Sequence, residues 1–139
     1  MIKEHACGAV IYRKQDEQKR YVVIKQKHGN HYGFPKGHME KDEDEVMTAY
    51  REVSEETGLD VFIIPNVRAE STYSPRFRVK KKVTYFLAEA RTAKFKPQHD
   101  EVTEILWLSE EEALKKLTYP IDRDILKMMV EYLERQEDA

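Results

Sequence analysis

The chain has few cysteines, little net charge and no long apolar run. One cysteine, Cys7, excludes an intrachain disulfide. Lysine and arginine number 24 against 26 aspartate and glutamate residues, so the net charge of −2 gives no overall attraction to nucleic acid or membrane. The sequence has no run of about 18 apolar residues, the length that a membrane-spanning helix needs. The first residues do not resemble a signal peptide. We therefore expect a cytoplasmic protein without membrane contacts and without a nucleic-acid partner.

Length and composition predict one domain. At 139 residues, of which 40% are hydrophobic, residues 1–139 should form a single core of moderate size. Strands are expected at 5–13, 20–26, 59–64, 69–73, 78–90 and 103–108, with a break at Pro65 between the third and fourth. Helices are expected at 44–57, 110–117 and 121–135. Loops are expected at 28–41 and 92–101. Mixed strands with few helices predict an α+β or layered α-β-α fold.

The helix at 44–57 carries three carboxylates on one face. Glu52, Glu55 and Glu56 stand at i, i+3 and i+4, a spacing that brings side chains together on a helix. Like charges at this spacing repel, so stability alone does not favour them. Hard oxygen ligands suit a divalent cation such as magnesium, and magnesium binds phosphate oxygens. The cluster therefore indicates phosphate chemistry.

The rest of this helix has the signals of a well-defined element. Residues at helical spacing on the opposite side can pack on a core: Val46, Tyr50, Val53 and Thr57. Asp42 or Asp44 can cap the N-terminus, and Gly58 suits a left-handed C-terminal cap. One face of the helix should thus be buried while the other presents acid to solvent.

The complete pattern runs from Gly37 to Leu59 and reads Gly37-x5-Glu43-x7-Arg51-Glu52-Val53-x-Glu55-Glu56-x-Gly58-Leu59. It resembles the signature box of the Nudix hydrolases, with every fixed position filled. The resemblance implies an α-β-α sandwich with a mixed central sheet. It also implies hydrolysis of a pyrophosphate linkage, with Mg²⁺ as the cofactor or Mn²⁺ in its place.

The resemblance also implies roles for residues of the box. It assigns metal ligation to three side chains, Glu52, Glu55 and Glu56, and often makes the first of them the base. Arg51 would orient a neighbouring glutamate, for which Glu43 is available. A main-chain carbonyl at Lys36 or Gly37 would complete a metal shell. In this family a further metal carboxylate commonly comes from a downstream loop. Glu101 is the first choice for it, ahead of Glu104 and Asp100.

The loop before the helix resembles particular branches of the family. Its Pro35-Lys36-Gly37-His38 run is similar to that of diadenosine tetraphosphate hydrolases and of diphosphoinositol phosphohydrolases. Residues 6–12, residues 81–89 and the Trp107-Leu108 pair also resemble the diadenosine enzymes. Tyr32 stands where those enzymes frequently have tryptophan. Six residues are candidates for substrate contacts: Lys36, His38, Tyr32, Tyr73, Lys81 and Tyr85.

Residues 76–82 form the one strongly basic run. They can clamp a polyphosphate, with Tyr73 and Tyr85 stacking on adenine, and the resemblance points to Lys81 for phosphate. The same run can be an edge strand protected by lysines, or a site for single-stranded nucleic acid. Four histidines have no paired spacing and are expected on the surface: His5, His28, His31 and His99.

The leading hypothesis is Mg²⁺-dependent cleavage of diadenosine tetraphosphate into AMP and ATP. A second keeps the mechanism and changes the substrate to a nucleoside triphosphate, an oxidised one, a nucleotide sugar or a diphosphoinositol phosphate. A third, from another class, is a nucleotide sensor without turnover. The sequence leaves open the base, the attacked phosphorus, the number of metal ions and the oligomeric state.

Overall fold

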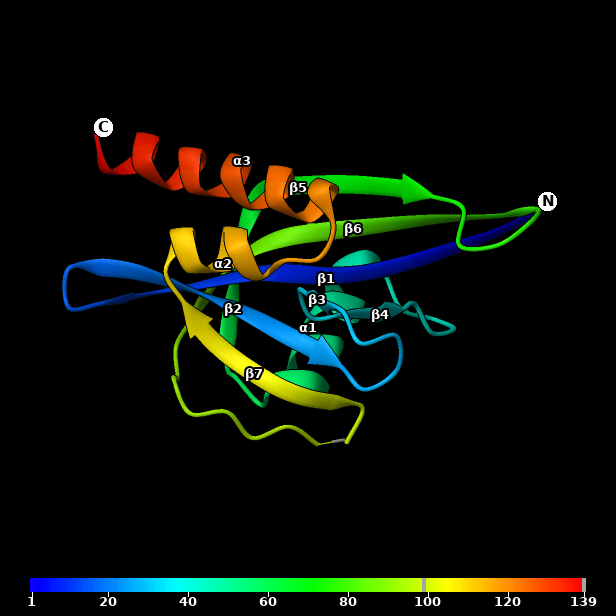
Figure 1. Ribbon diagram of the computed structural model, residues 1–139, viewed down its shortest axis with the longest axis horizontal. Coiled ribbons are helices and arrows are strands. Elements are labelled where there is room, and N and C mark those ends of the chain that lie inside the picture. The colour runs from blue at the N-terminus through cyan, green and yellow to red at the C-terminus, as the bar shows by residue number, and fades with distance from the viewer. Residues whose placement is uncertain (99, 139) are drawn as a thin grey trace.

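The fold is built on a mixed β-sheet with helices against both faces (Figure 1). The structure is a computed structural model and describes residues 1–98 and 100–138. Its elements follow one another along the chain as β1 (Ile2–Gln15), β2 (Gln18–Gln26), β3 (Tyr32–Gly33), β4 (Lys36–His38), α1 (Glu45–Thr57), β5 (Val61–Tyr73), β6 (Val79–Ala90), β7 (Val102–Leu108), α2 (Glu110–Lys116) and α3 (Pro120–Glu137).

The sheet has the order β3-β2-β1-β6-β5, with β4 paired to β1 and β7 paired to β2. The β1–β6 pair is parallel over a long register, from Ile2 opposite Val79 to Tyr12 opposite Glu89. The other pairs are antiparallel. The expected mixed sheet is therefore confirmed.

Two hydrophobic cores lie on opposite faces of this sheet, in place of the single core expected from the sequence. Alternation along β1 sends Ala6, Val10 and Tyr12 to one face, where they pack with residues of α2 and α3. The residues between them, such as Cys7 and Ile11, pack with the buried side of α1 on the other face. Figure 1 shows α2 and α3 on one side of the strands and α1 behind them. The fold is thus the expected α-β-α sandwich.

Local signals mark both ends of α1 and the start of α2 where the sequence predicts, whereas α3 is longer than the expected 121–135. The Asp44 side chain accepts a hydrogen bond from the Met47 N–H at 2.8 Å and caps α1. Gly58 ends α1 in the left-handed region at φ 73°. Ser109 and Glu112 form the capping box of α2.

The buried face of α1 differs from the prediction. Val53 and Thr57 are buried, but Val46 and Tyr50 are 40% and 38% exposed. Glu56 is buried in their place. The helix is rotated so that one of its acids faces β4, which places a carboxylate where an apolar side chain would otherwise pack.

The strand break expected at Pro65 is also wrong. β5 continues from Val61 to Tyr73, with a register shift between Ile63 and Arg68 where Asn66 takes a φ of 66°. A bulge leaves residues out of the ladder, which lets a proline without an N–H remain in the strand. The loop expected at 28–41 contains the two short strands β3 and β4. In the described residues, no helix is both long enough and apolar enough to span a membrane.

Candidate active site

Helix α1 holds Glu52 against strand β4. In the β1–β4 ladder, Cys7 pairs with Gly37 and Gly8 with Lys36, which fixes the backbone of β4 beneath the helix. A Cβ atom on Gly37 would overlap the Glu52 carboxylate. Only a glycine lets this carboxylate approach the β4 backbone so closely, which gives a physical reason for the first glycine of the box.

Glu56 is the most enclosed acid of the cluster. The residue is 8% exposed, and its Oε1 atom has no hydrogen-bond partner among the described residues. Burial raises the pKa of Glu56, and the charge of Glu52 raises it further, while the main-chain N–H of Lys36 hydrogen bonds to the carboxylate. Burial also raises the pKa of Glu52. Two buried carboxylates, one with an unpaired oxygen, form a site where a divalent cation would offset both their mutual repulsion and the cost of burying their charge.

Arg51 holds the neighbouring acids in place. Its Nε and Nη2 donate to the two oxygens of Glu43 at 2.6 and 3.0 Å, and Nη2 also donates to the His38 carbonyl at 2.9 Å. Its Nη1 reaches Glu52 at 3.0 Å and Glu55 at 3.2 Å. The guanidinium lowers the pKa of Glu43 to about 2. The expected contact between Arg51 and Glu43 is confirmed, and the arginine also positions two acids of the cluster.

The loop after β6 is tied to the end of α1. The Lys96 N–H donates to the Thr57 carbonyl and the Gln98 N–H to the Glu55 carbonyl, both at 2.8 Å. Glu101 follows this loop; it is exposed, and its carbonyl accepts from the Lys27 N–H at 2.8 Å. Residues 96 and 98 therefore contact the carboxylate helix, while the main chain of Glu101 contacts Lys27 at the end of β2. His99 lies outside the described residues.

Glu104, the second choice, already has a partner. The Tyr32 hydroxyl donates to Glu104 at 2.7 Å, which raises the pKa of Tyr32. The Tyr32 ring has the ammonium groups of Lys116 and Lys25 at 4.7 and 5.7 Å from its centroid. Tyr32 thus lies among cations at the edge formed by β2, β7 and α2.

Lys36 brings positive charge to buried Glu56, and Lys81 lies near Lys36. Burial lowers the pKa of Lys81, and the charge of Lys36 lowers it further, so the two ammonium groups are close enough to repel. Burial raises the pKa of both Glu56 and Asp122, and the charge of Lys36 opposes this by lowering both. Two lysines that repel each other, one of them near a buried acid, form an arrangement that a polyphosphate would neutralise.

Asp122, in the first turn of α3, was not singled out from the sequence. It is 6% exposed, and burial raises its pKa to about 6 despite the nearby charges of Lys36 and Arg123. Tyr73 and Tyr119 are 42% and 48% exposed. Burial raises the pKa of Tyr73, and the nearby Tyr119 and Asp122 raise it further. An aspartate in a first helical turn is an ordinary sequence feature, so no local signal marked it.

The expected role of Tyr85 is wrong. Its ring is 2% exposed and packs edge-on against Phe34, with the centroids 5.4 Å apart. A core ring of this kind presents no face for adenine to stack on. Tyr73 keeps an exposed ring and remains a candidate.

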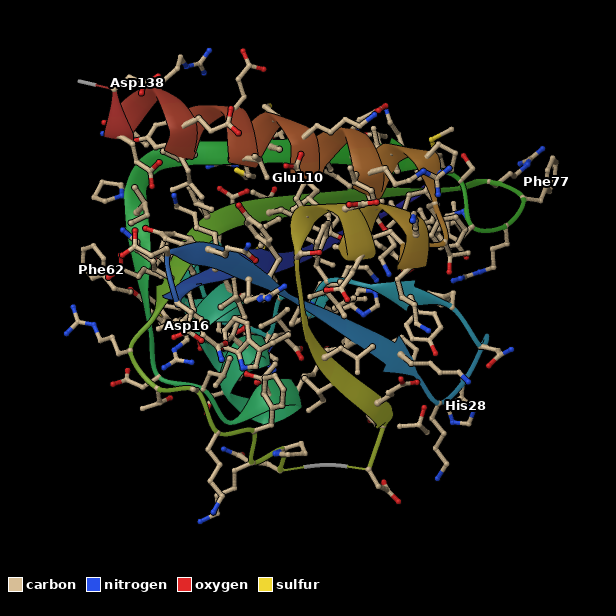
Figure 2. The ribbon with its side chains drawn as sticks, turned by 60° about the vertical axis from the view of Figure 1, so that its left-hand side comes forward. Asp16, His28, Phe62, Phe77, Glu110 and Asp138 are labelled. Atoms are coloured by element: carbon tan, nitrogen blue, oxygen red, sulfur yellow. The ribbon has the colours of Figure 1, made fainter. Side chains whose placement is uncertain are left out.

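The basic run is not an edge strand. β6 lies between β1 and β5, so the reading of residues 76–82 as a lysine-protected edge is wrong. Figure 2 shows Phe77 at the tip of the turn between β5 and β6, where it is 86% exposed. Glu4 pairs with two groups: its Oε1 lies 3.3 Å from Arg76 Nη2, and its Oε2 lies 3.1 Å from the His38 ring nitrogen. The run and the loop before α1 therefore meet at Glu4.

Comparison with known proteins shows the family to which the chain belongs. A family model for the NUDIX domain matches residues 3–129. The chain belongs to the Nudix family. It is 31% identical over 134 residues to an 8-oxo-(d)GTP phosphatase of Mycolicibacterium smegmatis, a match that covers 90% of this chain and 41% of the relative. It is 34% identical over 96 residues to an asymmetrical bis(5'-nucleosyl)-tetraphosphatase of Sus scrofa, a match that covers 62% of this chain and 65% of the relative. The chain thus spans less than two thirds of either relative.

Solved Nudix structures have the same fold. A binary complex of the Caenorhabditis elegans Ap4A hydrolase superimposes with a TM-score of 0.87 at 26% identity, covering 94% of this chain and 98% of that chain. The NUDIX domain of Shewanella oneidensis NrtR, solved with ADP ribose, superimposes with a TM-score of 0.71 at 17% identity, covering 98% and 90%. The second likeness concerns the fold alone.

Proposed function

We propose that this protein is a magnesium-dependent Nudix hydrolase that cleaves diadenosine tetraphosphate into AMP and ATP. The observation that carries the proposal is that one oxygen of buried Glu56 has no hydrogen-bond partner among the described residues. This carboxylate lies beside Glu52 and near Lys36. A buried acid of this kind is costly without a cation, and the adjacent lysine charge suits phosphate.

Each part of the site has a role in this proposal. Glu52, Glu55 and Glu56 would hold the ion, with Glu101 and the Gly37 carbonyl as further ligands. A bound Mg²⁺ supplies charge neutralisation and a more acidic water. Arg51 keeps the acids oriented through its bonds to Glu43, Glu52 and Glu55.

The substrate is held by the chain's own basic and aromatic groups. Lys36 and Lys81 bind the phosphate chain, and His38 stands at the same edge beside Glu4. Tyr32 and Tyr73 offer their rings to the bases. We expect the reaction in the cytoplasm, where the single thiol of Cys7 stays reduced.

Likeness along most of the chain supports the dinucleotide as substrate. The asymmetrical tetraphosphatase of Sus scrofa and the Caenorhabditis elegans enzyme carry that argument. The Mycolicibacterium smegmatis relative, an 8-oxo-(d)GTP phosphatase, keeps oxidised nucleoside triphosphates as the second candidate.

A substrate panel tests the proposal. Purified protein with Mg²⁺ is given diadenosine tetraphosphate, 8-oxo-dGTP, a nucleotide sugar and a diphosphoinositol phosphate, and the products are separated by chromatography. We expect the highest kcat/KM for the dinucleotide, with equal amounts of AMP and ATP. Two ADP molecules per substrate would contradict the asymmetric cut, and a higher kcat/KM for 8-oxo-dGTP would favour the second candidate.

One variant pair separates an enzyme from a sensor. Glu56→Gln should lower turnover by orders of magnitude, because the amide no longer offers a charged ligand to the ion. Glu111→Gln, on the exposed side of α2, is the matched control and should leave turnover unchanged. An unaltered protein that binds the nucleotides and cleaves none of them would be a sensor.

A further inference from the structure

A second group of metal-binding side chains lies at the start of α1. The Nε2 atom of His5 is 3.1 Å from Glu45 Oε2, 3.8 Å from Cys7 Sγ and 3.0 Å from the Thr84 hydroxyl. One donor atom from each of His5, Cys7 and Glu45 can be chosen so that all three lie within 4.8 Å of one another. We call these three residues the His5–Cys7–Glu45 cluster. It shares no residue with the carboxylate cluster of the candidate active site.

The fold assembles this cluster from elements far apart in the sequence. His5 and Cys7 stand two apart on β1, so their side chains share the face of the sheet that α1 covers. Glu45 is the first residue of α1, and Thr84 lies opposite Cys7 in the parallel β1–β6 register. The sequence predicted a surface histidine because no paired spacing joins His5 to another ligand. The side chain is 30% exposed, but its partners lie some 40 and 79 residues away in the sequence.

The donor set differs in kind from the active-site acids. It combines a thiol sulfur, an imidazole nitrogen and a carboxylate oxygen, the mixture that zinc accepts and magnesium does not favour. We propose that His5, Cys7 and Glu45 bind Zn²⁺ or a similar transition-metal ion at a second cation site. Three protein ligands leave a fourth, tetrahedral position for water.

In the ion-free structure, the Arg68 guanidinium is the cation paired with Glu45. Its Nη2 atom donates to Glu45 Oε2 at 2.8 Å and to Glu70 at 3.3 Å, and its guanidinium lies 5.3 Å from the Phe86 ring centroid. The Arg68 side chain is 40% exposed, so it can leave Glu45 and keep its other two partners. A metal ion that binds Glu45 would therefore replace Arg68 as its positively charged partner.

Metal binding also requires a proton to leave the thiol. Burial, followed by the charge of Glu45, raises the pKa of Cys7 to about 12, so the thiol is protonated in the ion-free protein. A thiolate forms as the ion binds, and the released proton goes to solvent. The binding step is therefore a proton-for-metal exchange at sulfur, with no oxidant or reductant involved.

The position of the cluster connects it to the active-site helix. Glu45 precedes Glu52 by two helical turns, about 10 Å along the axis. An ion shared by β1 and the first residue of α1 would fasten the N-terminus of that helix to the sheet. We expect zinc to raise the melting temperature of the protein through this link.

Cobalt provides a readout that the active-site acids cannot produce. Co²⁺ bound by a thiolate absorbs in the near ultraviolet through charge transfer from sulfur, and Cys7 is the one cysteine of the chain. We expect one equivalent of Co²⁺ to produce this band, Zn²⁺ to abolish it, and excess Mg²⁺ to leave it in place. The band should persist in Glu56→Gln, which separates this site from the proposed catalytic one.

Four variants assign the ligands. Cys7→Ser should abolish the band, and His5→Gln and Glu45→Gln should each weaken Co²⁺ binding by at least about tenfold. His28→Gln is the matched control, because His28 is exposed at the turn after β2 (Figure 2), and it should bind Co²⁺ like the unaltered protein. His5 and Glu45 are partly exposed, so their variants remain informative if Cys7→Ser fails to fold.

Two results would overturn the proposal. The first is the absence of a sulfur-to-cobalt band in the folded, unaltered protein at millimolar Co²⁺. The second is a band of equal strength and affinity in both His5→Gln and Glu45→Gln. The first result would mean that the cluster is an ion-pair network with Arg68 and no metal site; the second would mean that Cys7 binds the ion without His5 and Glu45.

Discussion

Replacing Asp122 by asparagine should stabilise the protein in a pH-dependent manner. Burial raises the pKa of Asp122 from an ordinary value of 3.8 to about 6, even though Lys36 and Arg123 favour the charged form. The folded state therefore prefers the protonated acid. Its contribution to stability is complete below pH 3.8 and is lost as the pH rises through 6.

The size of the effect follows from this difference. A pKa raised by about 2 corresponds to about 3 kcal/mol between the two protonation states. Asparagine has nearly the same shape and no charge, so Asp122→Asn avoids that cost at neutral pH. We expect the two proteins to have the same free energy of unfolding near pH 4. At pH 7.5 that of the variant should be higher by about 3 kcal/mol, which is roughly 10 °C in melting temperature.

Urea unfolding in the presence of EDTA, repeated from pH 4 to pH 8, measures the difference directly. Asp124→Asn is the matched control, because Asp124 is exposed on the same helix, two residues further on. Its stability curve should run parallel to that of the unaltered protein. If the Asp122→Asn curve is also parallel, ionising the buried Asp122 does not lower the free energy of unfolding by the expected amount, and the reasoning fails.

Three further predictions concern the active site. Gly37→Ala should lower kcat by about 100-fold, because the new Cβ displaces the Glu52 carboxylate; an unchanged kcat would refute the close approach. Lys81→Met should raise KM for a dinucleoside polyphosphate by about tenfold, while Lys80→Met, at an exposed position, should not; equal effects would remove Lys81 from phosphate binding. Arg51→Lys should lower kcat more than it raises KM, since a lysine cannot bridge the acids of the box; a pure KM effect would instead indicate substrate contact.

The parts of the fold that rest on local signals were predictable. Asp44 and Gly58 end α1 through contacts within a few residues of themselves, and Ser109 caps α2 in the same way. Most strands follow from runs of β-branched and aromatic residues. The acidic face of α1 follows from helical spacing alone.

The parts that depend on tertiary contacts were not predictable. Val46 and Tyr50 fit an apolar stripe, but they are exposed, and Glu56 is buried where the Lys36 N–H of β4 hydrogen bonds to it. Tyr85 stands near a basic run in the sequence, yet the pleat of β6 turns its ring into the core beside Phe34.

Residues from separate elements gave no joint signal at all. The buried Asp122 of α3 meets the charge of Lys36 from β4, more than 80 residues away. His5 meets Glu45 and Thr84 in the same way. Such groups become visible as sites only when the sheet has brought them together.

The most direct test of the central claim is a crystal structure of the protein with Mg²⁺ and a non-hydrolysable dinucleoside polyphosphate. We predict an ion about 2.1 Å from a carboxylate oxygen of Glu56, shared with Glu52 and with a phosphate oxygen. The contradicting result is a structure in millimolar Mg²⁺ in which Glu52 and Glu56 hold no ion and are paired only with Arg51 or Lys36.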